Sequence, residues 1–241
     1  MGWASPRRRV APVPRSPRNA VVWAVLDAEL TRGPAHVVDA GGGTGGFAVP
    51  LAQAGHTVTV VDPSPDALAA LARRAAERGV ADRITAYQGD ADDLGGLLEP
   101  GTADVVLCHS VLEVVDDPGR TLAAVAGVLR PGGCASILVA NRVAAVLARA
   151  LAGHFAAARD SLDGELDPRR YDLEGLSALI SKAGLVPERA HGVRVLADLV
   201  PGAVVDVEPG AADALTALEL AMAERPPYRD IATQLHVLAR R

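Results

Sequence analysis

The sequence is short of lysine and of aromatic residues. Lys182 is its only lysine, so nearly all of the 24 basic residues are arginine, and 29 acidic residues give a formal net charge of −5. Affinity for nucleic acids comes largely from neutralised phosphates, and bases are often held by stacking on aromatic rings. With two Trp, three Tyr and two Phe, the composition weighs against an extensive nucleic-acid-binding surface.

Cysteine and long apolar runs are also scarce. Cys108 and Cys134 lie in apolar runs, without the second cysteine pair or the histidine spacing of a zinc site. We expect two buried, reduced thiols, no bound metal and a cytoplasmic location. No apolar run reaches the roughly 18 residues of a membrane-spanning helix, and the charged N-terminal segment lacks a signal-peptide core. The protein is therefore expected to be neither exported nor membrane-embedded.

The length and the apolar content favour a single domain. The chain has 241 residues, of which 49% are hydrophobic, enough for one substantial core. Residues 1–17 hold four prolines and four arginines with no helical or strand period, which predicts a disordered arm. One domain is expected over residues 18–241, beginning with a helix near Arg18.

Short apolar runs alternate with amphipathic segments from residue 36 onward. This repetition predicts an α/β fold with a parallel sheet and helices on both faces, because parallel neighbours need a crossover connection. The alternation stops after Ala140, and residues 141–184 predict a small helical cap. Residues 191–200 and 231–240 are predicted as the last strands.

The segment SPDALAALARRAAERG, residues 64–79, has clear helix signals. Ser64 is a suitable N-cap, Pro65 suits the first helical position, and Gly79 suits the C-cap. The strand before this helix, TVTVVD, then ends at Asp62. That residue is predicted at the carboxyl edge of the sheet, where open α/β folds bind ligands.

Five glycines crowd residues 41–46, directly after the predicted strand HVVDA. A glycine inside a helix or strand costs about 0.5–1 kcal/mol relative to alanine, so the cluster indicates that a ligand approaches the backbone closely. Gly41, Gly43 and Gly46 fit the G-x-G-x-x-G pattern of dinucleotide-binding folds, and Asp62 follows about twenty residues later.

Asp39 favours a different cofactor. Together with Gly41, Gly43 and Gly45 it gives the pattern by which the chain resembles the class I S-adenosylmethionine methyltransferases. A carboxylate beside the loop would repel a pyrophosphate but suits the sulfonium and ammonium groups of S-adenosylmethionine. A capping role for Asp39 at the strand end remains the alternative.

The resemblance implies a Rossmann-like fold with a mostly parallel seven-stranded sheet, and it assigns further residues. Asp62 would accept both ribose hydroxyls, and Asp90 with Ala91 would hold the adenine. The alternatives are a capped turn at Asp62 and, for the run DADD, a solvated helix start. His109, at the end of the strand ADVVLCH, would line the cofactor or the substrate, unless it is a structural histidine. Glu113 is expected to cap a turn rather than to face the substrate.

A closer resemblance covers the chain from Arg18 to its end. The chain is similar, in order and spacing, to the bacterial tRNA 5-carboxymethoxyuridine carboxyl methyltransferases in the segments RNAVVW (18–23), DAGGG (39–43), HSVLEVVDDP (109–118), LRPGG (129–133), AGHF (152–155), GVRV (192–195) and ERPPYRDIATQLHVLAR (224–240). This resemblance implies cofactor contacts at Arg18, Gly41, Gly42, Asp62, Ala91 and His109.

Two departures concern the RNA substrate. The segment RDSLDGELD stands where the family has a lysine-rich stretch, and Val114 stands where it has a tryptophan. A local basic wall could still form from Arg142, Arg149, Arg159, Arg169, Arg170, Arg189 and Arg194.

The residues of the glycine loop predict a methyltransferase, and the closer resemblance implies that it acts on the carboxylate of a modified wobble uridine in tRNA. An ionised carboxylate needs no general base, so catalysis rests on alignment and on donors that hold the anion. Arg194 and Tyr228 are the candidate donors; the alternatives are an outward strand arginine and a packing tyrosine. A small-molecule O- or N-methyltransferase and a cofactor-binding protein without turnover remain alternatives. Asp39 and the absence of a Tyr-x-x-x-Lys pair disfavour an NAD-dependent oxidoreductase.

Overall fold

The computed structural model describes residues 16–162 and 169–241. Nearly all of the expected arm at 1–17, and the last five residues of the segment RDSLDGELD (163–167), lie outside the described residues. The described chain begins with a short 3₁₀ turn, Pro17–Asn19, which leads directly into the first helix.

Seven strands form one mixed sheet in the order β3-β2-β1-β4-β5-β7-β6. The strands are β1 His36–Ala40, β2 Thr57–Asp62, β3 Ile84–Gln88, β4 Ala103–His109, β5 Leu129–Ala140, β6 Val186–Val193 and β7 Gln234–Arg240. All neighbouring pairs are parallel except those of β7, which runs antiparallel to both β5 and β6. The predicted α/β class and the mostly parallel seven-stranded sheet are confirmed.

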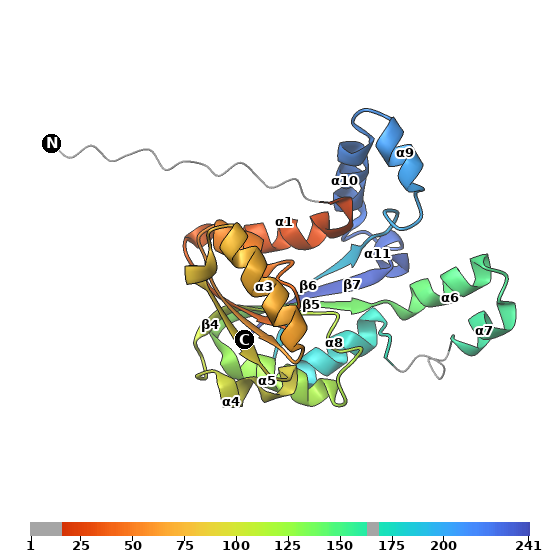
Figure 1. Ribbon diagram of the computed structural model, residues 1–241. Coiled ribbons are helices and arrows are strands. Elements are labelled where there is room, and N and C mark those ends of the chain that lie inside the picture. The colour runs from red at the N-terminus through yellow and green to blue at the C-terminus, as the bar shows by residue number, and fades with distance from the viewer. Residues whose placement is uncertain (1–15, 163–168) are drawn as a thin grey trace.

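Helices cover both faces of the sheet (Figure 1). One face packs against α1 Ala20–Glu29, α2 Ala48–Gln53 and α3 Pro65–Glu77. The other packs against α4 Leu94–Leu97, α5 Pro118–Val128 and α8 Leu173–Lys182. Most residues of the central strands β1, β2, β4, β5 and β7 are buried, whichever face they point to, which is the pattern of a sheet covered on both sides.

The helix signals of residues 64–79 are confirmed. The Ser64 hydroxyl accepts the Ala67 N–H at 3.2 Å, and Gly79 adopts a left-handed φ of 66° one residue after the helix cap. Leu71 and Ala75 are buried against the sheet. The strand before this helix ends at Asp62, as predicted.

The segment 141–184 differs from the expected cap. Helices α6 Arg142–Leu151 and α7 Phe155–Asp160 extend away from the sheet (Figure 1). Helix α8 instead packs on the sheet, because Leu176 and Ile180 are fully buried in its core. Within the described residues, the protruding part is therefore α6 and α7.

The predicted strand at 191–200 is wrong in its second half. β6 ends at Val193, and Arg194 has a left-handed φ of 61° that no strand accommodates. The following loop is held by Glu219, whose buried carboxylate accepts the N–H groups of Val195, Leu196 and Ala197 at 2.7–2.9 Å.

Three helices near the C-terminus were not predicted. They are α9 Gly202–Val207, α10 Ala211–Met222, which carries Glu219, and α11 Tyr228–Ile231. Figure 1 shows α9 and α10 beside α1, above the sheet edge that holds β6. They add a small layer that the alternation of strands and helices did not indicate.

Candidate active site

A cleft of about 490 Å³ opens at the carboxyl edge of the parallel strands. It lies where open α/β folds bind their ligands. Four of the predicted cofactor residues line it: Gly41, Asp62, Asp90 and Ala91. The other lining residues are Pro63, Asp92, Ser110, Val111, Val114, Val115 and Asp116.

The glycine loop after β1 fits tightly between its neighbours. Gly41 has a left-handed φ of 72°, and a Cβ there would lie 2.5 Å from a methyl group of Val111. A Cβ on Gly42 would lie 2.7 Å from the carboxyl group of Asp39. Side chains are therefore excluded at both positions, because Val111 and Asp39 pack directly against the loop.

Asp62 closes the turn at the end of β2. Its carboxylate accepts the N–H of Gly43 at 2.8 Å and the N–H of Ser64 at 2.9 Å. Asp62 therefore caps the turn, which was the alternative to a role in ribose binding. Each carboxylate oxygen has a second lone pair, so the same group can also accept hydroxyls from the cleft.

Asp39 lies beneath the glycine loop and is 3% exposed. Burial, and to a smaller degree the charge of Asp62, raise the pKa of Asp39 to about 7. Its Oδ2 atom is buried and has no hydrogen-bond partner among the described residues. A buried carboxylate without a partner favours a cation nearby.

The contacts of the acids in the run DADD, residues 90–93, show which carboxylate is available to a ligand in the cleft. Asp92 is paired with Arg120 at 3.4 Å, whereas the Asp90 side chain caps no helix and Asp93 is not among the cleft residues. Asp90 is thus the carboxylate of this run that faces the cleft with its acceptors available, next to buried Ala91.

His109 is the last residue of β4, directly before the cleft residues Ser110 and Val111. Its Nε2 atom lies 2.8 Å from the Ser136 hydroxyl, and its ring packs edge-on against Phe47 at 4.7 Å between centroids. Its Nδ1 atom is buried without a partner among the described residues. Burial lowers the pKa of His109 to about 3, so the ring is neutral at pH 7.

Arg18, Arg194 and Tyr228 are not among the residues that line the cleft. Arg18 pairs with Asp198 at 3.2 Å, and Arg194 donates to the Asn19 side chain at 3.3 Å. Tyr228 is 48% exposed on α11. The structure brings the two arginines together at Asp198 but does not place any of the three beside the predicted cofactor residues.

Glu113 holds the backbone at the last residue of β5, whereas the start of helix α6 is capped by Asn141. Its carboxylate accepts the Ala140 N–H at 2.6 Å, and burial raises the pKa of this carboxyl group.

Among the arginines of the predicted basic wall, several are paired with carboxylates: Arg142 with Asp172, Arg159 with Asp160, Arg189 with Glu224 and Arg194 with Asp198. These pairs reduce the positive charge of the wall.

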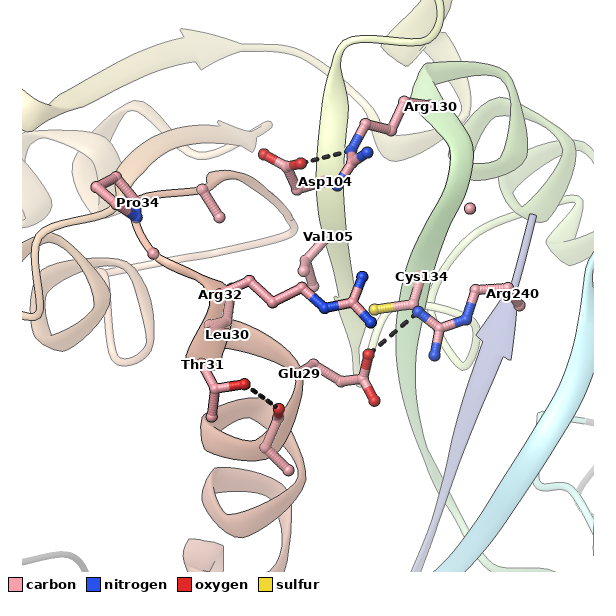
Figure 2. Close-up of a pocket in the computed structure, with 14 residues that line it drawn as sticks. Glu29, Leu30, Thr31, Arg32, Pro34, Asp104, Val105, Arg130, Cys134 and Arg240 are labelled. Atoms are coloured by element: carbon pink, nitrogen blue, oxygen red, sulfur yellow. Dashed lines mark hydrogen bonds and ion pairs between the residues drawn. The ribbon is translucent and has the colours of Figure 1, made fainter.

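A second cavity, of about 540 Å³, lies at the opposite edge of the sheet (Figure 2). Arg130 pairs there with Asp104 at 2.5 Å, and Arg240 pairs with Glu29 at 3.1 Å. Cys134 lies beside them, and burial raises the pKa of its thiol to about 12. None of the predicted cofactor residues lines this cavity, so the ligand motifs gather at the first cleft.

Two features are absent from the described residues. No group of three or more His, Cys, Asp or Glu side chains is arranged to hold a metal ion there. In the same residues, every helix is too short or too polar to cross a bilayer.

Comparison with known proteins agrees with the site. Residues 38–137, which run from within β1 into β5 and include the glycine loop, match a methyltransferase domain family. The tRNA 5-carboxymethoxyuridine methyltransferase of Escherichia coli (strain K12) is 30% identical over 237 residues, covering 93% of this chain and 88% of that protein. A ubiquinone biosynthesis O-methyltransferase of Xanthomonas euvesicatoria pv. vesicatoria (strain 85-10) is 32% identical over 135 residues, or 56% of this chain and 55% of its own length.

Solved structures show the same fold. The magnesium protoporphyrin IX methyltransferase from Synechocystis PCC 6803, crystallised with S-adenosylhomocysteine, superposes with a TM-score of 0.60 at 18% identity over 93% of this chain and 81% of that one. The cleft, the glycine loop and a relative that spans nearly the whole chain lead to one conclusion. The chain is an enzyme of the class I S-adenosylmethionine-dependent methyltransferases, in the family that includes the bacterial tRNA 5-carboxymethoxyuridine methyltransferase.

Proposed function

We propose that this methyltransferase transfers a methyl group to the carboxylate oxygen of a 5-carboxymethoxyuridine in tRNA, in the cytoplasm. The observation that carries the proposal is the 30% identity to the Escherichia coli enzyme of that name over 93% of the chain. The similarity extends beyond the cofactor-binding half into the protruding helices and the C-terminal strands, the parts in which enzymes of one fold differ in their acceptors.

S-adenosylmethionine, the cofactor of the family, fits the residues of the cleft. The unpartnered Oδ2 of Asp39 suits a cationic group, and Gly41 of the glycine loop lines the cleft. Asp62 and Asp90 supply carboxylate acceptors, and Ala91 a backbone N–H beside them. We assign these residues, with His109 and Arg18, to cofactor binding. When bound, the cofactor supplies the activated methyl group.

Methyl transfer depends on how the acceptor carboxylate is oriented toward the methyl group. An aligned acceptor gains up to about 7–11 kcal/mol from proximity alone, and anion donors add to it. Arg194 and Tyr228 are our candidates for these donors. Because Arg194 contacts Asn19 and Asp198, this role requires that it leave those partners when tRNA binds.

A second candidate is methylation of a small molecule. The ion pairs that occupy several wall arginines reduce the positive surface available to RNA. A ubiquinone biosynthesis O-methyltransferase also matches just over half of the chain. If this candidate is correct, the protruding helices enclose a metabolite instead of contacting tRNA.

Mass spectrometry of tRNA nucleosides separates the two candidates. Deletion of the gene should remove the methyl ester of 5-carboxymethoxyuridine and leave the free acid. Reintroduction of the wild-type gene should restore the ester, and the Asp62→Ala variant should restore it poorly. An unchanged nucleoside profile in the deletion strain would refute the tRNA substrate and leave the small-molecule candidate.

A further inference from the structure

The side chains that line the active-site cleft are apolar or acidic, with one exception. The exception is Ser110, which is exposed. The other lining residues are the acids Asp62, Asp90, Asp92 and Asp116, and Gly41, Pro63, Ala91, Val111, Val114 and Val115. An ionised carboxylate only accepts hydrogen bonds, whereas a hydroxyl also donates one. Ser110 thus carries the one side-chain donor among the described residues that line this cleft.

The acceptor carboxylate of the proposed function, on which this inference rests, needs a donor in such a cleft. Like charges repel a carboxylate there, and an anion is held in place by donors aimed at its oxygens. Arg18, Arg194 and Tyr228 do not line the cleft. Ser110 is therefore the side-chain donor already present where the acceptor has to lie.

The backbone holds Ser110 at the edge of the sheet. Ser110 follows His109, the last residue of β4, and its N–H donates to the Leu138 carbonyl on β5 at 2.7 Å. Its φ of 56° lies in the left-handed region, where only Ser110 and Arg194 among the described residues are not glycine. Ser110 therefore carries a side chain at a position whose backbone favours glycine.

Ser110 also lies next to the glycine loop. The following residue, Val111, packs so closely against the loop that a Cβ on Gly41 would lie 2.5 Å from a Val111 methyl group. Gly41 and Ser110 line the same cleft. An acceptor has to meet the methyl group of a cofactor bound at this loop, so the group that binds the acceptor must lie in the same cleft, as Ser110 does.

The Ser110 hydroxyl keeps its proton available for a ligand. Its Oγ accepts one hydrogen bond, from Nε2 of Gln234 at 3.4 Å, and within residues 16–162 and 169–241 this hydroxyl forms no other. A hydroxyl has one proton and two lone pairs, so the contact with Gln234 uses a lone pair and leaves the proton free. Gln234 is the first residue of β7, so the last strand of the sheet helps to orient a residue of the cleft.

We propose that the Ser110 hydroxyl binds the acceptor carboxylate in the cleft. The hydroxyl donates its proton to one carboxylate oxygen, and the other oxygen stays free for methylation. A hydrogen bond to a charged acceptor is about twice as strong as one between neutral groups. Ser110 is thus a specificity-determining residue, which favours an acceptor with a carboxylate over a neutral one.

The contact with Ser110 weakens once the methyl ester has formed. The ester carries no charge, so its hydrogen bond with the hydroxyl falls to the strength of a bond between neutral groups. The hydroxyl therefore holds the acid more tightly than the ester, which assists release of the product and limits its rebinding.

Nuclear magnetic resonance titration of the full-length protein, saturated with S-adenosylhomocysteine, tests this binding directly. The probes are the nucleosides 5-carboxymethoxyuridine and 5-methoxyuridine, of which the second lacks the carboxyl group. Wild-type protein should bind the acid at least tenfold more tightly than the neutral nucleoside. The backbone N–H signal of Ser110 should shift on addition of the acid.

Three substitutions at Ser110 suit its left-handed backbone, which glycine, asparagine and aspartate tolerate. Ser110→Gly removes the hydroxyl and should reduce the preference for the acid to twofold or less, while S-adenosylhomocysteine affinity stays within twofold. Ser110→Asn supplies another donor and should keep a preference of at least fivefold. Ser110→Asp has nearly the shape of Ser110→Asn but adds a negative charge, so it should bind the neutral nucleoside better than the acid.

Methylation of tRNA by the same proteins separates this inference from the proposed function. In Ser110→Gly, the KM for tRNA should rise at least tenfold. The role of Ser110 is overturned, even if tRNA is methylated, if the wild type shows no preference for the acid or if Ser110→Gly keeps it. Weakened S-adenosylhomocysteine binding in Ser110→Gly would also overturn it, because the hydroxyl would then serve the cofactor. A preference that Ser110→Gly loses, with no methylation of tRNA by the wild type, would uphold the carboxylate site and refute the tRNA substrate.

Discussion

At the scale of single residues, Asp62 is the carboxylate with two tasks. It holds the turn through Gly43 and Ser64 and faces the cleft. Asp62→Ala should weaken S-adenosylhomocysteine binding by about 1.5–3 kcal/mol, because charged hydrogen bonds to the ligand are lost. Isothermal titration calorimetry measures this, with Asp66→Ala on the exposed start of α3 as the control. Equal affinities for Asp62→Ala and the control would remove Asp62 from the binding site.

Asp39 gives a prediction about pH and stability. The pKa of Asp39 is about 7 in the folded protein, against an ordinary value of 3.8. Between these two pH values the folded protein holds a proton on Asp39 that the unfolded chain has lost. Wild-type stability is therefore lost as pH rises from about 4 to about 7. Asp39→Asn removes this loss and should raise the free energy of unfolding at pH 8 by about 1–3 kcal/mol.

The gain from Asp39→Asn should shrink as the pH falls toward 4, because both proteins are then neutral at this position. Urea unfolding of the cofactor-free protein at pH 5 and pH 8 measures the difference. A gain of equal size at both pH values would show that the carboxyl group is not perturbed.

The predicted cofactor residues that line the cleft could be found from the sequence because each lies at or near the end of a recognisable strand. Gly41 follows β1, Asp62 is the last residue of β2, and Asp90 and Ala91 come shortly after β3. The carboxyl ends of parallel strands meet at one edge of the sheet. The contacts of His236 with Ser136 and His191 could not be predicted in this way. They form only because β7 inserts, antiparallel, between β5 and β6.

At the scale of elements, the segment after β6 shows that alternating apolar residues do not always form a strand. Val193, Val195 and Ala197 alternate like a strand and are all buried, but Arg194 turns the backbone and Glu219 binds the N–H groups that a neighbouring strand would have bound. The signal for this arrangement was a lone acid in the apolar sequence of α10. Its partners are backbone groups, which carry no sequence signature.

Glu219 should accordingly be a major stabilising residue of the C-terminal part. Glu219→Ala leaves three backbone N–H groups without their charged acceptor and should lower the free energy of unfolding by about 2–4 kcal/mol. Asp213→Ala, an exposed acid on the same helix, should cost about 1 kcal/mol or less. Denaturant unfolding of both variants provides the comparison, and similar losses would contradict the role of Glu219.

At the scale of the whole molecule, the residues that line the cofactor cleft and the other predicted site residues come from different parts of the chain. The cleft residues come from β1 to β4 and their loops, whereas Arg18, Arg194 and Tyr228 lie on the first turn, the loop after β6 and α11. Their predicted roles depend on how these distant elements close on a bound substrate, which neither the local sequence nor the ligand-free arrangement determines. Those roles stay predictions.

The central claim is that this enzyme makes a methyl ester on tRNA, and the chemistry of the product tests it most directly. Wild-type protein is incubated with S-adenosylmethionine carrying a radioactive methyl group and with tRNA that contains 5-carboxymethoxyuridine, and the labelled tRNA is then treated with mild alkali. An ester is hydrolysed by alkali, whereas an ether or an N-methyl group is not. The account predicts label that enters only tRNA with the carboxyl group and is released by alkali; label that resists alkali, or enters tRNA without that group, would contradict it.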